Sequence, residues 1–196
     1  PLTNRQREFV ATISANAQHV ISLAEDLLTE AKIDAQLFDL RLEQVDLRDL
    51  VRDTVRDARR LHHTSVRLDD ADGPLSLLGD RALLTQALWN LVNNACRHAG
   101  PGSTVTVALA SSEGEAILSV TDEGTGMSSA ERDRLFEPFA SAAPTGRDAD
   151  IPGGSPAAPG GTGLGMTITE RIIAQHGGRM LVDTVPGHGT TIFCTV

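Results

Sequence analysis

The sequence has few of the features that mark membrane proteins, disulfide scaffolds or nucleic-acid-binding proteins. No apolar run approaches the roughly 20 residues that a membrane-spanning helix needs, and the segment Pro1–Arg5 is not typical of a signal peptide. The two cysteines, Cys96 and Cys194, are far apart and neither belongs to a CxxC pair. This favours a reducing compartment and argues against a zinc site. The net charge is −9, with no basic cluster beyond Arg59-Arg60, which argues against a surface for duplex nucleic acid.

What the sequence does contain is typical of a folded domain with an appended element. It has 196 residues, of which 40% are hydrophobic and 22% are charged, and these supply enough apolar side chains to bury a core. The first residue is Pro1 rather than a methionine, and we expect the chain to be part of a longer protein.

Residues 1–36 are predicted to form a long helix, set apart from a domain at residues 37–196. Apolar residues recur in the alternating spacing of a heptad seam: Val10, Ile13, Ala17, Val20, Ala24, Leu27 and Ala31. Because such a seam suits helix-on-helix packing, the spacing favours a helical bundle. A single helix lying on the surface of the following domain is the alternative, since it would also need a wide apolar stripe.

The rest of the chain alternates between helical and strand-like patterns. Asp46 is a predicted N-cap, and the helix after it has an inward-facing stripe of Leu47, Leu50, Val51, Val55, Ala58 and Leu61. Further helices are predicted at residues 81–99, 129–136 and 166–176, and strands at residues 40–43, 66–68, 75–78, 105–110, 117–121, 180–183 and 190–196. Tight turns join several strands, so we expect an α+β fold, a mixed and largely antiparallel sheet with helices on one face.

A loop is predicted at residues 140–159. Of its 20 residues, 15 are Ala, Pro, Gly or Ser, and Ile151 is its one large apolar side chain. A segment of this composition cannot bury enough apolar surface to order itself, so we expect the loop to be mobile.

Polar residues share one face of the predicted helix at 81–99. Asn90, Asn94 and Arg97 follow one another at spacings of four and three residues, away from the apolar stripe of the helix. Asn disfavours helix interiors, whereas its carboxamide oxygen is a suitable ligand for Mg²⁺. The face is therefore either a metal-ligating surface or an ordinary helix surface.

Three glycine-containing turns come after this helix. The strand that ends at Asp122 runs into Glu123-Gly124-Thr125-Gly126. A carboxylate there can accept a hydrogen bond from an exocyclic amine such as that of adenine, and an ordinary turn is the alternative. Residues 160–165, Gly-Gly-Thr-Gly-Leu-Gly, open a helix and form a candidate anion site without the Lys-Ser/Thr ending of a Walker motif. The turn at residues 187–190 by itself indicates only a hairpin.

Together, these features resemble the ATP-binding domain of sensor histidine kinases, which belongs to the GHKL superfamily and has the Bergerat fold. The matching segments, in chain order, are Asn90–Ala95, Asp122–Gly126, Phe136–Phe139, Gly160–Gly165 and Gly187–Thr190. Residues 2–35 resemble the second helix of the kinase dimerisation hairpin. The resemblance therefore covers the whole chain, and several motifs agree with the family in order and spacing.

The resemblance implies a role for each matching residue, with ATP and Mg²⁺ as the cofactors. Asn94 is the implied Mg²⁺ ligand, Asp122 is the acceptor for the adenine amine, and Gly124 and Gly126 shape the pocket. The other implied nucleotide-binding residues are Asn90, Arg97, His98, Gly161, Thr162, Gly163, Leu164, Gly165 and Thr190. The loop at 140–159 corresponds to a mobile lid.

For the whole protein, the resemblance implies transfer of the ATP γ-phosphoryl group to a His on an upstream helix, and thence to an Asp of a response regulator receiver domain. It also implies a homodimer and a cytoplasmic location. A cytoplasmic part of a membrane-anchored sensor would fit this location as well. Contact with a membrane is expected only through segments outside this chain. No His after Pro1 lies in the motif expected for the phosphate acceptor. We therefore expect this chain alone to bind ATP without phosphorylating itself.

Two other functions are alternatives. A nucleotide-binding or degenerate scaffold domain would keep the motifs and lack phosphoryl transfer. A GHKL ATPase clamp of the type II topoisomerase or MutL kind uses a Glu as general base four residues before the Mg²⁺-binding Asn. Asn90 stands at that position, and a carboxamide cannot take a proton from water.

Overall fold

The computed structural model describes residues 40–62, 64–70, 75–112, 114–140 and 163–196, together with Thr3 and scattered positions between 5 and 31. Those scattered positions are helical, as the heptad spacing predicts, and the rest of the expected N-terminal helix lies outside the described residues. Within the described part of the chain, no helix is both long enough and apolar enough to cross a membrane.

Four helices and seven strands follow the N-terminal segment in the described residues. They are β1 (Glu43–Asp46), α2 (Leu47–Leu61), β2 (Ser65–Asp70), β3 (Ser76–Gly79), α3 (Arg81–His98), β4 (Thr104–Ser112), β5 (Glu115–Asp122), α4 (Ser129–Asp133), α5 (Gly165–Gln175), β6 (Arg179–Thr184) and β7 (Thr190–Thr195).

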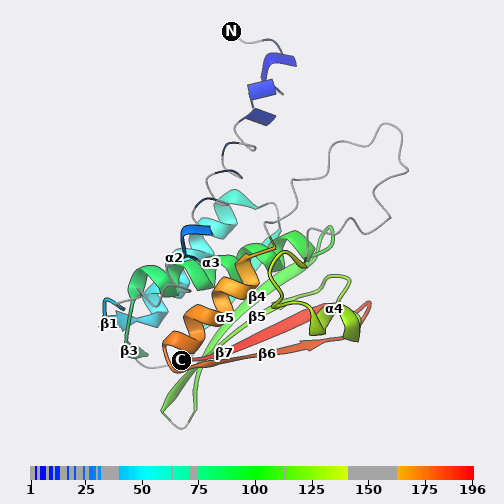
Figure 1. Cartoon of the computed structure of the whole chain (residues 1–196). Helices are drawn as coiled ribbons and strands as arrows, with labels where there is room; N and C mark the ends of the chain where they lie inside the picture. Colours follow the sequence, from blue (N-terminus) through cyan, green and yellow to red (C-terminus); the bar gives the residue numbers. More distant parts are fainter. Residues whose placement is uncertain are drawn as a thin grey trace.

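The main sheet has five strands in the order β2-β4-β5-β7-β6. Only β2 and β4 are parallel, and the other three pairs are antiparallel. Strands β1 and β3 form a separate antiparallel pair. Figure 1 shows α2, α3 and α5 together on one face of the main sheet. The expected mixed, largely antiparallel sheet with helices on one face is therefore confirmed.

The core lies between this helical layer and the sheet. Strand β4 alternates as a half-buried strand should, with Val105, Val107 and Leu109 buried. The buried residues of α3 include Leu88 and Leu91, which the apolar stripe predicts. Packing of the helix stripes on this sheet face closes the core and leaves the polar face of α3 to the candidate site.

The ends of α3 and α5 are set by short-range hydrogen bonds. Asp80 caps α3, because its Oδ1 accepts from the backbone N–H groups of the second and third helical residues at 3.0 and 3.2 Å. At the end of α5, Gly177 has a φ of +78°, and the Gly178 N–H donates to the Ile173 carbonyl at 3.0 Å. This is a Schellman motif, which ends the helix where the Gly-Gly pair predicts.

Three local predictions were wrong. The first strand covers Glu43–Asp46 rather than residues 40–43, because fully buried Val45 pairs with β3, while Leu42 is 52% exposed. Leu61 is 69% exposed rather than inward-facing, since α2 ends there. The helix predicted at 129–136 ends at Asp133, and turns follow it.

Candidate functional site

Helix α3 connects the two parts of the candidate site. Near its middle, the Asn90 Nδ2 group donates a hydrogen bond to the backbone carbonyl of Gly165 in α5, at 3.2 Å. At its end, the backbone of His98 lies against Gly124, where a Cβ would clash with the His98 carbonyl. Asn94 falls one helical turn from each of these positions. The helix therefore places Asn94 between the start of α5 and the turn after β5.

Asn94, the predicted metal ligand, is half-buried. Among the residues that the structure describes, its carboxamide has no hydrogen-bond partner. The neighbouring Asn93 differs, because its side chain forms a hydrogen bond with His62 at the end of α2. The carboxamide of Asn94 is thus available to a ligand, whereas that of Asn93 is used within the fold.

Asp122 is the one charged side chain that is buried within the described part of the chain, with 7% of its surface exposed. It ends β5, and its Oδ1 accepts a hydrogen bond from the Gly124 N–H at 2.8 Å. Burial raises the pKa of Asp122, while the N–H groups of Gly124 and Thr190 and the charge of His98 act in the opposite direction. Two carboxylate oxygens can accept further hydrogen bonds, so Asp122 can recognise a buried donor.

The last turn of α3 brings two basic side chains, Arg97 and His98, to the same region. Partial burial of the His98 ring, and then the charge of Arg97, lower the pKa of His98, while the Asp122 carboxylate acts in the opposite direction. His98 therefore lies within electrostatic reach of Asp122. Arg97 is exposed at the surface of the last turn of α3.

Two glycines allow the backbone around Asp122 to pack closely. Gly126 has a φ of +61°, and a Cβ there would clash with the Val185 carbonyl. Gly189 has a φ of +87°, and a Cβ there would clash with the Asp122 carbonyl. Both positions require glycine for conformational and steric reasons. They hold the turn after β5 against the turn between β6 and β7, where Thr190 pairs directly with Asp122.

The start of α5 provides a candidate anion site. Leu164 is the N-cap and gives no side-chain hydrogen bond to the helix, so the first N–H groups are left to other acceptors. Gly163 has a φ of +73°, and its carbonyl accepts from the Phe139 N–H at 3.0 Å. The Thr167 hydroxyl donates to the Phe136 carbonyl at 2.9 Å. These two bonds join the start of α5 to the segment after α4.

The structure brings most of the predicted site residues into one region. They lie on α3 (Asn90, Asn94, Arg97, His98), after β5 (Asp122, Gly124, Gly126), at the start of α5 (Gly163, Leu164, Gly165) and on β7 (Thr190). Gly161, Thr162 and, apart from Ala140, the predicted lid at 140–159 lie outside the described residues.

Sequence reasoning missed two residues beside the site. Phe139 has a φ of +62° and is 52% exposed, which is unusual for a bulky side chain. Thr167 is buried and bonds to Phe136, 31 residues earlier in the chain. No local pattern predicts either feature, although the Thr in the first turn of a helix was a visible candidate for such a bond.

A separate open groove of about 670 Å³ lies between α2 and α3. Leu61 and Trp89 form part of its lining, and its charged residues are partly paired, with Asp57 Oδ1 3.6 Å from Arg60 Nη1. The groove contains none of the predicted site residues. It is therefore distinct from the candidate site.

Comparison with protein families decides the identity of the domain. Residues 79–196 match the family described as histidine kinase-, DNA gyrase B-, and HSP90-like ATPase. This match includes α3, the turn after β5, the start of α5 and β7. The chain belongs to this family.

Curated relatives of this ATPase-family chain are sensor histidine kinases. The sensor protein GacS of Pseudomonas syringae pv. syringae is 35% identical over 203 residues, which cover 100% of this chain and 21% of GacS. The histidine protein kinase DivJ of Caulobacter vibrioides is 32% identical over 195 residues, which cover 98% of this chain and 31% of DivJ. The chain therefore spans between a fifth and a third of the length of these relatives.

Solved histidine kinase structures share the fold of this ATPase-family chain. Full-length ShkA, crystallised in complex with AMPPNP, superposes with a TM-score of 0.77 and 25% identity, covering 100% of this chain and 39% of ShkA. The mycobacterial sensor histidine kinase MprB superposes with a TM-score of 0.63 and 27% identity, covering 79% of this chain and 96% of MprB. The ATP-binding catalytic domain of histidine kinases is thus the fold that the described residues adopt.

Proposed function

We propose that this domain binds ATP with Mg²⁺ in the region bounded by α3, the turn after β5 and the start of α5. The observation that supports this most directly is the burial of Asp122. Burying a carboxylate is costly unless it has a specific partner. Its position, next to glycines that permit close approach of a ligand, suits the exocyclic amine of adenine.

The triphosphate would extend from Asp122 towards the start of α5. The N–H groups after Leu164 lack a side-chain cap, and the helix dipole adds partial positive charge there. Arg97 and His98 end the facing helix α3, and Thr190, which pairs with Asp122, would border the adenine end. Because the chain carries a net charge of −9, recognition of a polyphosphate depends on such locally directed groups.

The residues present fit a divalent cation. Asn94 offers a neutral carboxamide oxygen that no described residue uses, and oxygen ligands of this kind suit Mg²⁺ when phosphates complete the coordination shell. When bound there, Mg²⁺ would neutralise charge on the phosphates. Asn94 would hold it, and Asn90 would keep α5 in place beside it through the bond to Gly165.

For the full-length protein, we propose ATP-dependent phosphorylation of a His in a helical segment and onward transfer to the Asp of a response regulator receiver domain. In the first step, the bond between the γ-phosphorus and the bridging oxygen of ADP breaks, and a phosphorus–nitrogen bond to the imidazole forms. The sensor histidine kinase names of GacS and DivJ support this proposal. We further propose that the full-length protein is a homodimer with this domain in the cytoplasm.

The structure also bears on the two alternatives. A clamp ATPase needs a base at the position of Asn90, but the Asn90 amide group is committed as a donor to Gly165 and to the Thr169 hydroxyl, 3.4 Å away. This arrangement disfavours water activation at that residue. A scaffold domain that binds nucleotide without transfer would share the whole site, so only an activity measurement separates it from a kinase.

The test is incubation of the full-length protein with ATP labelled at the γ-phosphate, followed by acid treatment. A kinase gives protein-bound label that acid removes, as expected for phosphohistidine, and Asp122→Asn strongly reduces this label when ATP is kept near the dissociation constant of the parent protein. Asp69→Asn is the matched control, because Asp69 is exposed on β2 and paired with Arg67 at 2.9 Å. Tight ATP binding without any protein label would identify the scaffold alternative instead.

A further inference from the structure

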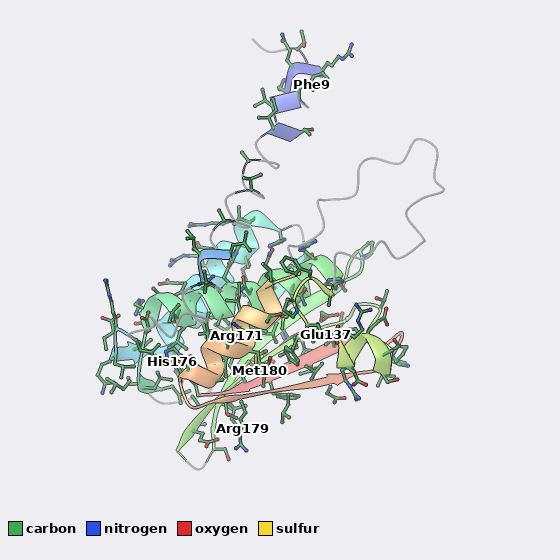
Figure 2. All side chains as sticks on the ribbon, viewed as in Figure 1. Phe9, Glu137, Arg171, His176, Arg179 and Met180 are labelled. Atoms are coloured by element: carbon green, nitrogen blue, oxygen red, sulfur yellow. The ribbon has the colours of Figure 1, made fainter. Side chains whose placement is uncertain are left out.

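His176 uses both of its ring nitrogens in hydrogen bonds at the end of α5. The Asp80 N–H donates to Nε2 at 2.9 Å, and Nδ1 lies 2.8 Å from the Ile172 carbonyl. A carbonyl can only accept, so the proton is on Nδ1 and the ring is neutral in this arrangement. Figure 2 shows His176 at the end of α5, and its bond to Asp80 reaches the start of α3.

The residue that His176 contacts is itself held from two other directions. One oxygen of Asp80 caps α3, and the other accepts from the Arg41 N–H at 3.1 Å. Behind it, the His176 ring packs on Gly79, where a Cβ would lie 3.0 Å from the ring carbon Cδ2. Asp80 is therefore a rigid anchor, and the bond to His176 ties α5 to it directly.

Helix α5 packs on α3 mainly through apolar side chains. Ala87, Leu164, Ile168 and Ile172 form one buried cluster, and Met166 and Ile173 of α5 belong to the main core. Polar bonds join the two helices at both ends of this cluster, His176 to Asp80 at one end and Asn90 to Gly165 at the other. Apolar packing is not directional, so these two bonds fix the position of α5 along and around α3.

We propose that His176 is a positioning residue for nucleotide binding, and that it acts through α5. The eleven residues of α5 form a stiff rod about 16 Å long, so loss of its fixed end displaces its other end. That end carries the N–H groups assigned above to the phosphates, opposite Asn94. The inference rests on the proposed ATP site, and it adds a residue at the far end of the helix that no motif of that site includes.

The test compares variants of His176 with a variant that is equally destabilised elsewhere. His176→Leu and His176→Ala both remove the acceptor, and Leu keeps apolar bulk against Gly79. His176→Gln restores an acceptor oxygen at the same number of bonds from Cα as Nε2. Val66→Ala is the control, because Val66 is buried on β2 at the other edge of the sheet. Each variant is titrated with ATP and Mg²⁺ by calorimetry, and its melting temperature is measured.

We expect the Leu and Ala variants to raise the dissociation constant for ATP about threefold to thirtyfold. The Gln variant should return the dissociation constant close to the parent value. Val66→Ala should leave the dissociation constant unchanged, although it lowers the melting temperature by a similar amount to the Leu and Ala variants. If Leu and Ala variants that fold bind ATP as tightly as Val66→Ala, His176 only stabilises the fold and the proposal is wrong.

Amide hydrogen exchange provides a second readout that needs no nucleotide. Loss of the His176 acceptor should speed exchange at residues 168–171, the first residues of α5 whose N–H groups donate within the helix, near the end away from the substitution. Val66→Ala should not do so. If the parent protein fails to bind ATP, the proposed function falls, while exchange at residues 168–171 still decides whether His176 positions the start of α5. Unchanged exchange there in the Leu and Ala variants would overturn the inference.

Discussion

In the proposed site, Asp122 would recognise the ligand at a cost in stability. Its side chain is buried, and that burial raises its pKa despite hydrogen bonds from the backbone N–H groups of Gly124 and Thr190. At neutral pH the folded protein therefore holds a carboxylate in a place that favours a neutral group. Such a conflict is expected at a binding site, where the charged form is kept because the ligand needs it.

We predict that Asp122→Asn raises the melting temperature of the nucleotide-free protein at pH 7. Because the folded-state pKa lies above the unfolded-state value of about 4, ionisation of Asp122 disfavours the folded state as the pH rises through this interval. The increase in melting temperature should be largest at pH values above the raised pKa of Asp122, and it should disappear below about pH 4. Thermal melts across this pH range check it, with Asp69→Asn as the exposed control, and a variant that melts below the parent at pH 7 would contradict it.

Asn94 and Asn93 offer a matched pair of adjacent carboxamides on different faces of α3. Asn94→Ala should weaken ATP binding about tenfold or more when Mg²⁺ is present, because a metal ligand is lost, and should have little effect in EDTA. Asn93→Ala removes only the bond to His62 and should leave the affinity close to that of the parent. Titrations with and without Mg²⁺ measure both, and an equal loss in EDTA would make Asn94 a structural residue.

At the level of elements, α5 contributes to both apolar clusters. Ile168 and Ile172 pack with Ala87 of α3 in the smaller cluster, while Met166 and Ile173 belong to the main core with α2, α3 and the sheet. Parts of a domain can open locally before the whole domain unfolds. The smaller cluster is therefore expected to respond to substitutions that leave the sheet intact.

Ile168→Ala tests this difference between the two clusters. Ile168 has no exposed surface, and the substitution should cost about 2–5 kcal/mol of stability measured by denaturant titration. Amide exchange should rise first within α5. Val107→Ala, in β4 and equally buried, should instead raise exchange across the sheet. The same exchange pattern for both variants would mean that the two clusters unfold as one unit.

For the whole molecule, the sequence predicted the layers of the fold because its patterns had clear periods. Buried and exposed residues alternate in β4, Asp80 precedes a helical stripe, and the Gly177-Gly178 pair follows one. Where a prediction failed, tertiary contacts overrode the local pattern. The alternation at residues 40–43 is typical of a strand, but pairing with β3 begins at Glu43 and buries Val45.

The site was predictable to the extent that its residues belong to short motifs. The motifs implied that Asn90, Asp122 and Gly165 belong to one site. Asn90 of α3 bonds to Gly165, and Gly124, which bonds to Asp122, lies against His98 at the end of the same helix. The bond between Asp80 and His176 joins residues 96 positions apart in the chain. Neither residue stands in a motif that indicates the other, so only the fold shows the contact.

The most direct measurement is a calorimetric titration of ATP with Mg²⁺ into the parent protein, Asp122→Asn and Asp69→Asn. The proposed site predicts a dissociation constant in the micromolar to millimolar range for the parent. Loss of a charged acceptor should weaken binding by Asp122→Asn about 10- to 100-fold, and Asp69→Asn should match the parent. Equal affinity in all three proteins, or no binding by the parent, would contradict the assignment of Asp122 and of the ATP site around it.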